Sequence, residues 1–222
     1  MSASTLPDAP ELIERIKRAM DAAHAEWQTG TKQSDAIKSH VWKLGFDLAD
    51  ECRVPLYPFA SSVKATRDEA GEYARDRLDR RRGHFWPYPE EHSVLKEFHY
   101  DVTWVEFSGE YTGFGADRHD RNTPKHFPAF RRLVLALESE LSGGPASGWP
   151  RWQVLFDFNK LLCARADLRV MVWPRDKIEE GVTLLESRLQ SAAGWDAGSW
   201  LLSGWGNDGF EHVAYHNGQR QN

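Results

Sequence analysis

Three carboxylates and one lysine occur at spacings that could bring them to a single site. Asp101 lies in an alternating segment, Glu138 and Glu140 end an apolar run, and Lys160 lies in the next helical pattern. Mg²⁺ is commonly held by one or two carboxylates together with water molecules. If the segments that carry Asp101 and Glu138 are neighbouring strands, they predict a divalent-cation site, to which the main-chain carbonyl of Ser139 could add an oxygen.

A lysine beside such a cation could act directly on water or on a phosphate group. Lys160 could orient or help to deprotonate an attacking water molecule, or stabilise charge that develops on a phosphate group. The alternative for Lys160 is a surface ion pair with Asp157, three residues earlier in the same helical pattern. The alternative for Asp101 is a solvent-facing position. The alternative for Glu138 and Glu140 is the end of an edge strand, but like charges there repel each other unless something neutralises them, which favours a bound cation or a basic partner.

Two segments that carry these acids are typical of β-strands. From 98 to 104 apolar residues alternate with polar ones, which is the period of a half-buried strand, and Asp101 shares the polar face with His99 and Thr103. The segment Leu133–Glu140, LVLALESE, predicts another strand, and one of its faces carries both glutamates. Glycines at positions 109, 113 and 115 predict turns around a shorter strand between the two.

The other periodicities complete an α/β fold. Two helices are expected in the first fifty residues, and further helices at 152–164 and 178–189. The apolar run 168–173, ended by Pro174, is typical of a buried parallel strand. Two final strands, at 200–202 and 210–215, are expected around a turn at 207–209. We therefore expect a mixed central β-sheet flanked by helices.

A chain of 222 residues is expected to form one domain. Within it we expect an N-terminal helical pair at 1–52, an elaboration at 53–97 with a short charged helix near 66–81, and an α/β core at 98–216. The two cysteines argue against a disulfide framework. Neither a signal peptide nor a long apolar span is present, so the sequence predicts a cytoplasmic protein with no membrane partner. The sequence does not indicate an oligomeric state.

The net charge bears on the class of partner. At −5, it argues against a protein that coats nucleic acid nonspecifically, because such binding depends on Lys and Arg contacts to phosphate. It is compatible with an enzyme whose acidic site is neutralised by a bound metal ion. Motifs for a zinc hydrolase, a nucleophile elbow or a phosphate-binding P-loop are absent from the sequence.

Four runs resemble a known superfamily. DVTW (101–104), ALESE (136–140), DFNKLL (157–162) and ARADLRVMVW (164–173) together resemble a bacterial branch of the restriction-endonuclease-like, or PD-(D/E)XK, nucleases. The resemblance implies a restriction-endonuclease-like core that hydrolyses phosphodiester bonds of nucleic acid with Mg²⁺ or Mn²⁺. It implies Asp101 as the first metal ligand and Glu138 as the acid of the second motif. Glu140 would assist or hold a second ion, and Lys160 would act on water or phosphate.

The chain departs from the family's pattern at two positions. Members commonly carry a lysine two residues after the second acid, where this chain has Glu140, so the lysine would be Lys160 on the following helix, as in some members. Tyr100 stands where the family has a proline. Glu140 and the acidic balance favour an alternative, a catalytically inactive binding protein of the same fold, such as an accessory or immunity-type protein. The sequence does not choose between DNA and RNA.

Overall fold

The computed structural model describes residues 5–61, 99–114, 124–141, 152–174, 178–191 and 198–221, with the side chains of 108–114 and 124–129 excepted. These residues form four helices and seven strands of an α/β fold. In chain order they are α1 (Ala9–Trp27), α2 (Gln33–Cys52), β1 (Leu56–Ala60), β2 (Val102–Phe114), β3 (Pro124–Ser139), α4 (Trp152–Cys163), β4 (Ala166–Pro174), α5 (Ile178–Ser191), β5 (Ser199–Gly206), β6 (Gly209–His216) and β7 (Gln219–Gln221).

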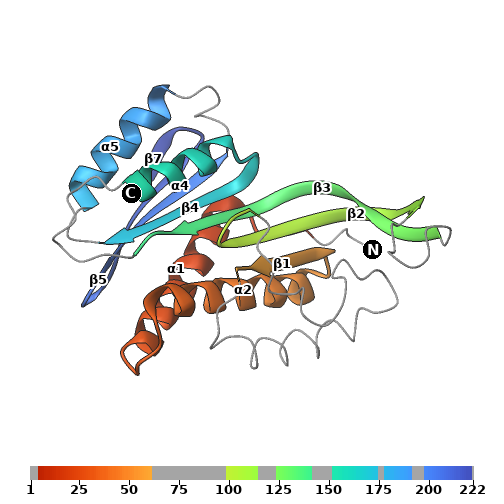
Figure 1. The fold of residues 1–222 in the computed structure, drawn as a ribbon, viewed down its shortest axis with the longest axis horizontal. Coiled ribbons are helices and arrows are strands. Elements are labelled where there is room, and N and C mark those ends of the chain that lie inside the picture. Colours follow the sequence, from red (N-terminus) through yellow and green to blue (C-terminus); the bar gives the residue numbers. More distant parts are fainter. Residues whose placement is uncertain are drawn as a thin grey trace.

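The seven strands form one mixed sheet in which spatial order follows chain order. β1, β2 and β3 are antiparallel neighbours, β4 is parallel to both β3 and β5, and β5, β6 and β7 are again antiparallel. Helices α1 and α2 cover one face of this sheet, and α4 and α5 cover the other (Figure 1). The predicted mixed sheet flanked by helices is confirmed.

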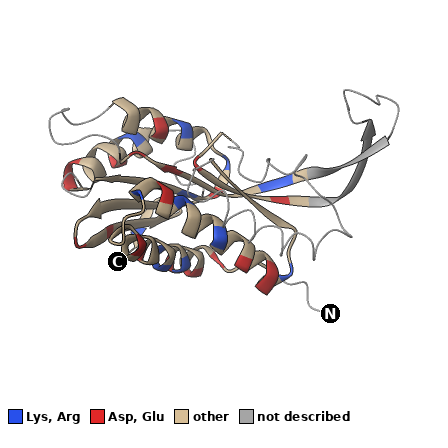
Figure 2. Ribbon diagram, turned by 60° about the horizontal axis from the view of Figure 1, so that its bottom comes forward, with Lys and Arg blue, Asp and Glu red and all other residues tan. Residues whose placement is uncertain are grey.

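The N-terminal helices form where their periodicity predicted them. The side chain of Asp8 accepts a hydrogen bond from the main-chain N–H of Glu11 (3.0 Å), which satisfies an N–H that the first turn leaves unpaired. Ile16, Met20 and Ala23 recur at helical spacing and are fully buried. Figure 2 shows acidic and basic residues interspersed along the outer surfaces of the helices. Each helix therefore turns its apolar stripe to the sheet.

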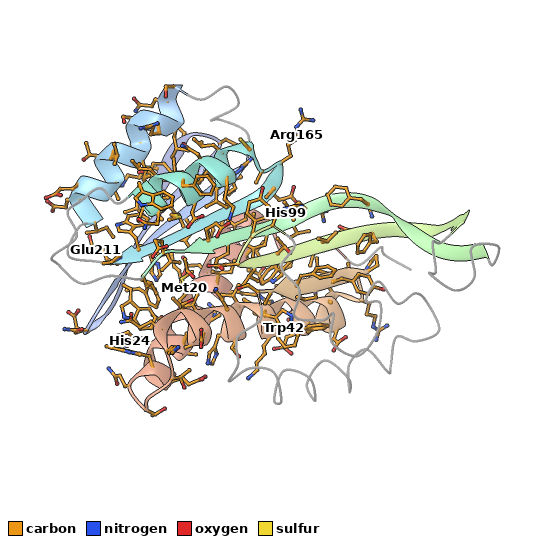
Figure 3. The ribbon with its side chains drawn as sticks, in the orientation of Figure 1. Met20, His24, Trp42, His99, Arg165 and Glu211 are labelled. Carbon is orange, nitrogen blue, oxygen red and sulfur yellow. The ribbon has the colours of Figure 1, made fainter. Side chains whose placement is uncertain are left out.

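A glycine lets α2 lie directly on the sheet. A Cβ atom added at Gly45 would lie 2.6 Å from Nε1 of Trp104 on β2 and 2.7 Å from Cγ of Pro58 on β1. Trp104 is fully buried, and Trp42, labelled in Figure 3, belongs to the same packed layer. This close approach fixes the position of α2 over the first two strands, and with it the position of the polar residues that α2 carries.

Strand β1 was not predicted. It lies within the segment expected to be an elaboration, yet all five of its residues are buried and it pairs with β2. Pro58 argues against a strand in the sequence, because proline cannot donate a ladder hydrogen bond and is tolerated mainly at a sheet edge. β1 is such an edge strand. The charged helix expected near 66–81 lies outside the described residues.

Strand β2 is longer than predicted and contains no turn at Gly109 or Gly113. It runs from Val102 to Phe114, and its pairing with β3 shifts register at three places, one of them between Ser108 and Glu110. Glycine inside a strand often marks such an irregularity rather than a turn. The predicted turns at positions 109 and 113 are therefore wrong, and position 115 is outside the described residues.

The centre of the sheet is buried on both faces. Residues 168–173 of β4 are all buried, which confirms the predicted parallel strand. Thr103 of β2 is fully buried as well, so the prediction of a half-buried strand is wrong there. Helices cover both faces of the sheet at this position, so neither face of the strand is open to solvent. β5 and β6 form the expected C-terminal hairpin.

No helix among the described residues is long and apolar enough to cross a membrane.

Candidate functional site

Asp101 precedes β2 and joins the ends of the two strands beside it. Its Oδ2 atom accepts hydrogen bonds from the main-chain N–H (3.0 Å) and the hydroxyl (2.8 Å) of Ser139, the last residue of β3. Its Oδ1 atom accepts a bond from the hydroxyl of Ser61 (3.2 Å), which directly follows β1. The main-chain carbonyl of Asp101 also accepts from the N–H of Ser61 (2.9 Å). The carboxylate is thus fixed where β1, β2 and β3 meet.

A lysine from α2 completes the surroundings of Asp101. Nζ of Lys38 lies 2.7 Å from Oδ1 of Asp101, and both side chains are about 15% exposed or less. Lys38 was not predicted, because it stands beside the buried Ile37 in a regular helical pattern and belongs to no motif. Ser61 and Ser139 were missed as side-chain partners for the same reason. Only the folded structure brings these side chains to Asp101, and no local sequence pattern marks them.

Glu138 lies one residue before the end of β3 and is almost completely buried. Its carboxylate forms an ion pair with Lys160 of α4, the helix that follows β3 in the chain. Because α4 and α2 lie on opposite faces of the sheet, Lys160 and Lys38 approach this sheet end from opposite sides (Figure 1). Nζ of Lys160 also lies 3.4 Å from Oδ1 of Asp157. The pair with Asp157 and the contact with Glu138 therefore occur together.

The buried charge of Glu138 is only partly compensated. Oε1 of Glu138 is buried and forms an ion pair with Nζ of Lys160. Burial raises the pKa of Glu138 to about 8, because loss of water opposes the charged form more than Lys160 favours it. The charges of Asp101 and Asp157 raise it further. The surroundings of Glu138 therefore favour its protonated form more than water does.

The same surroundings act on the lysine. Burial by itself would lower the pKa of Lys160, but the contact with Glu138 and the charges of Glu138 and Asp157 outweigh burial, so the pKa is raised. The hydroxyl of Tyr100 donates to the main-chain carbonyl of Lys160 (3.5 Å), and Nζ of Lys160 lies 5.8 Å from the centre of the Tyr100 ring. Tyr100 thus borders the lysine.

Glu140 and Asp157 lie at the border of this group. Glu140 follows β3, is half-buried, and its main-chain N–H bonds to the carbonyl of Val172 on β4 (3.0 Å). Burial raises the pKa of Asp157, Lys160 opposes this, and the charges of Asp101 and Glu140 add to the increase. Asp157 therefore lies in the electric field of Asp101 and Glu140, and Glu138 lies in that of Asp101 and Asp157.

The structure brings Asp101 and Glu138 to the ends of adjacent strands, with Lys160 beside them. Among the described residues, no three His, Cys, Asp or Glu side chains come close enough to hold a metal ion together, so Glu140 does not join the other two carboxylates as a third ligand. The two carboxylates contact lysines from opposite helical layers, Asp101 with Lys38 of α2 and Glu138 with Lys160 of α4. A cation held by both carboxylates would have to replace both lysine contacts, with water molecules as its further ligands.

Comparison of the chain with models of known families, with curated proteins and with solved structures finds no match. The chemistry of the site therefore has to be inferred from its own residues.

Proposed function

We propose that the chain is a divalent-metal-dependent phosphodiesterase that hydrolyses nucleic acid and has a restriction-endonuclease-like core. The observation that supports this proposal is the position of Asp101 and Glu138 at the ends of neighbouring strands, with Lys160 on the helix that follows the second strand. That is the order of acid, acid and lysine that the resemblance implies. The partial compensation of the Glu138 charge is the physical reason to expect a cation there.

Each residue of the candidate site would have its own role in the reaction. Asp101 and Glu138 would hold Mg²⁺ or Mn²⁺, and Glu140 would assist from the end of β3 or hold a second ion. The bound ion would withdraw charge from the phosphate oxygens and acidify a bound water molecule. Lys160, moved off Glu138, would orient the attacking water or stabilise the negative charge on phosphate. Tyr100 would restrict where the ammonium of Lys160 can go.

Titration of Mn²⁺ into the purified protein by calorimetry tests the metal site without a choice of substrate. We expect saturable binding that Glu138→Gln abolishes. A matched control is Glu106→Gln, because Glu106 is equally buried in the same sheet but pairs with Arg131 (2.7 Å) and Arg132 (2.6 Å) away from the site. Binding that is lost equally in both variants would reflect general damage to the sheet rather than loss of a ligand.

Hydrolysis is tested next with labelled single-stranded and double-stranded DNA and RNA in the presence of Mn²⁺. We expect cleavage by the unaltered chain and none by Asp101→Ala or Glu138→Ala. Cleavage that persists in either alanine variant would remove that residue from the mechanism. Circular dichroism of each variant shows whether it has kept its fold.

A second candidate is a catalytically inactive binding protein of the same fold. The observation that favours it is the saturation of Asp101, whose two oxygens receive contacts from Lys38, Ser61 and Ser139 of the same chain. A carboxylate held in this way has a structural role without any metal. A folded chain that neither binds Mn²⁺ nor cleaves nucleic acid would favour this candidate over the phosphodiesterase.

A further inference from the structure

Lys38 belongs to the candidate site, although the group of residues that the sequence predicted, Asp101, Glu138, Glu140 and Lys160, does not include it. Its ammonium lies 2.7 Å from Oδ1 of Asp101 at a position that is largely buried. We propose that Lys38 is a positioning residue that competes with a divalent cation for Asp101 and thereby sets the metal affinity of the site. The inference rests on the proposed function, because it assumes that Asp101 is a metal ligand.

The contacts of Asp101 show why a cation must displace one of the donors that now contact its carboxylate. A carboxylate offers about four acceptor positions on its two oxygens. Oδ2 receives the main-chain N–H and the hydroxyl of Ser139, and Oδ1 receives Lys38 and the hydroxyl of Ser61. With all four positions taken, a metal ion can bind Asp101 directly only after one donor has left.

Lys38 is the donor that can leave at the smallest structural cost. The N–H of Ser139 is part of the main chain at the end of β3, so it cannot move away without opening that strand end. Ser61 is held beside Asp101 by a main-chain hydrogen bond of 2.9 Å. Lys38 reaches Asp101 through a flexible side chain from α2, so its ammonium can rotate away while the backbone stays in place.

The charge of Lys38 also makes it the donor that a divalent cation would displace. An ammonium group and a divalent cation on one carboxylate oxygen repel each other, whereas the neutral hydroxyls of Ser61 and Ser139 do not. Lys38 therefore stands in for the cation when none is bound, and it keeps the carboxylate of Asp101 oriented at the strand ends. Once displaced, its ammonium remains tethered beside the site, where the negative charge of a substrate phosphate would lie.

The test compares Mn²⁺ binding by the full-length chain and three variants, using calorimetry without substrate. Lys38→Met removes the competing charge, so we expect Mn²⁺ to bind about fivefold more tightly, the size expected from loss of one partly exposed ion pair. Lys38→Arg keeps a cation that can pair with Asp101, so its affinity should stay within about twofold of that of the unaltered chain. Lys43→Met is the matched control on α2 and should bind as the unaltered chain does.

Thermal unfolding gives a second reading that separates competition from a purely structural role. In EDTA, Lys38→Met should melt at a lower temperature than the unaltered chain, because Asp101 has lost its cationic partner. Saturating Mn²⁺ should raise the melting temperature of the variant by more than it raises that of the unaltered chain. A purely structural lysine would give the first effect without the second. If Lys38→Met does not fold, Lys38→Gln carries the same expectations.

The outcomes are distinct. Mn²⁺ binding by the unaltered chain, with equal or weaker binding by Lys38→Met, would overturn the role of Lys38 and leave the proposed function standing. Tighter binding by Lys38→Met, or binding by that variant alone, would support the inference. Absence of Mn²⁺ binding in both proteins would overturn the inference together with the metal site on which it rests.

Discussion

The carboxylate of Glu138, near the end of β3, lies against the ammonium of Lys160 on α4, the helix that follows that strand. Only 4% of the Glu138 side chain and 29% of the Lys160 side chain are exposed. At the same sheet end, Asp101 pairs with Lys38 from the opposite helical layer. Each strand carboxylate therefore has a lysine partner of its own, and the two lysines come from different faces of the sheet.

Removing Lys160 should destabilise the fold through Glu138. We expect Lys160→Met to lower the free energy of unfolding by about 1–3 kcal/mol at a pH above 8, because Glu138 is then buried without a cation and must either stay charged or take up a proton from solvent at that pH. The double variant Glu138→Gln, Lys160→Met should regain most of this loss, since a neutral amide needs no counter-charge. Urea unfolding of both single variants, the double variant and the unaltered chain measures the coupling. A double variant as unstable as Lys160→Met would contradict it.

The pKa of Glu138 predicts a pH dependence of stability. Burial raises it to about 8 in the folded chain from an ordinary value of 4.5. Between these values the folded chain holds a proton that the unfolded chain has released. The contribution of Glu138 is therefore fully present below about pH 4.5 and is lost as the pH rises through about 8. We expect this slope in urea unfolding of the unaltered chain, relative to a flatter profile for Glu138→Gln. Parallel profiles would show that Glu138 titrates normally.

His212 predicts the opposite dependence at lower pH. Its Nδ1 atom lies 2.9 Å from the hydroxyl of Ser203, its ring stacks on Phe210, and among the described residues its buried Nε2 atom has no hydrogen-bond partner. Burial lowers the pKa of His212 to about 4, and the charge of Lys17 lowers it further. The ring therefore stays neutral in the folded chain at pH values where the unfolded chain protonates it.

The stability that His212 contributes is present above its ordinary pKa of 6.5 and is lost as the pH falls through about 4. The full loss is up to about 3 kcal/mol, because one pKa unit corresponds to about 1.4 kcal/mol. Comparing unfolding free energies of the unaltered chain and His212→Gln over this interval isolates the effect from that of other groups. If the two differ by a constant amount at every pH, His212 is not the titrating group.

Gly45→Ala should destabilise the chain, although the same change usually stabilises an exposed helix by about 1 kcal/mol. The added methyl group would lie 2.6 Å from Nε1 of Trp104 and 2.7 Å from Cγ of Pro58, and both side chains are buried. We expect a loss of about 1–3 kcal/mol, as for other overpacked cores. Thermal unfolding followed by circular dichroism measures it. A variant as stable as the unaltered chain would mean that α2 can shift away from β1 and β2.

Local periodicity was sufficient to predict most of the elements. Helices α1, α2, α4 and α5, the parallel strand β4 and the hairpin of β5 and β6 all follow from apolar spacing, because one face of each packs against the core. β1 escaped prediction, since Pro58 interrupts its pattern and its partner β2 is remote in the sequence. The glycines of β2 were misinterpreted as turns, because local sequence does not distinguish a turn from a register shift that pairing with β3 absorbs.

For the site, the sequence by itself determined the residue types and their order: Asp101, then Glu138 near the end of a strand, then Lys160 on the next helix. Its placement of Asp101 within a strand was wrong, because β2 begins at Val102 and His99 has a positive φ of 67°. Tertiary structure alone decided which charges meet. Lys38 reaches Asp101 because Gly45 lets α2 lie close to β1 and β2, and Lys160 reaches Glu138 because α4 covers the end of β3. The raised pKa of Glu138 likewise comes from burial between two helical layers, which no local pattern contains, because desolvation depends on every element packed around a group.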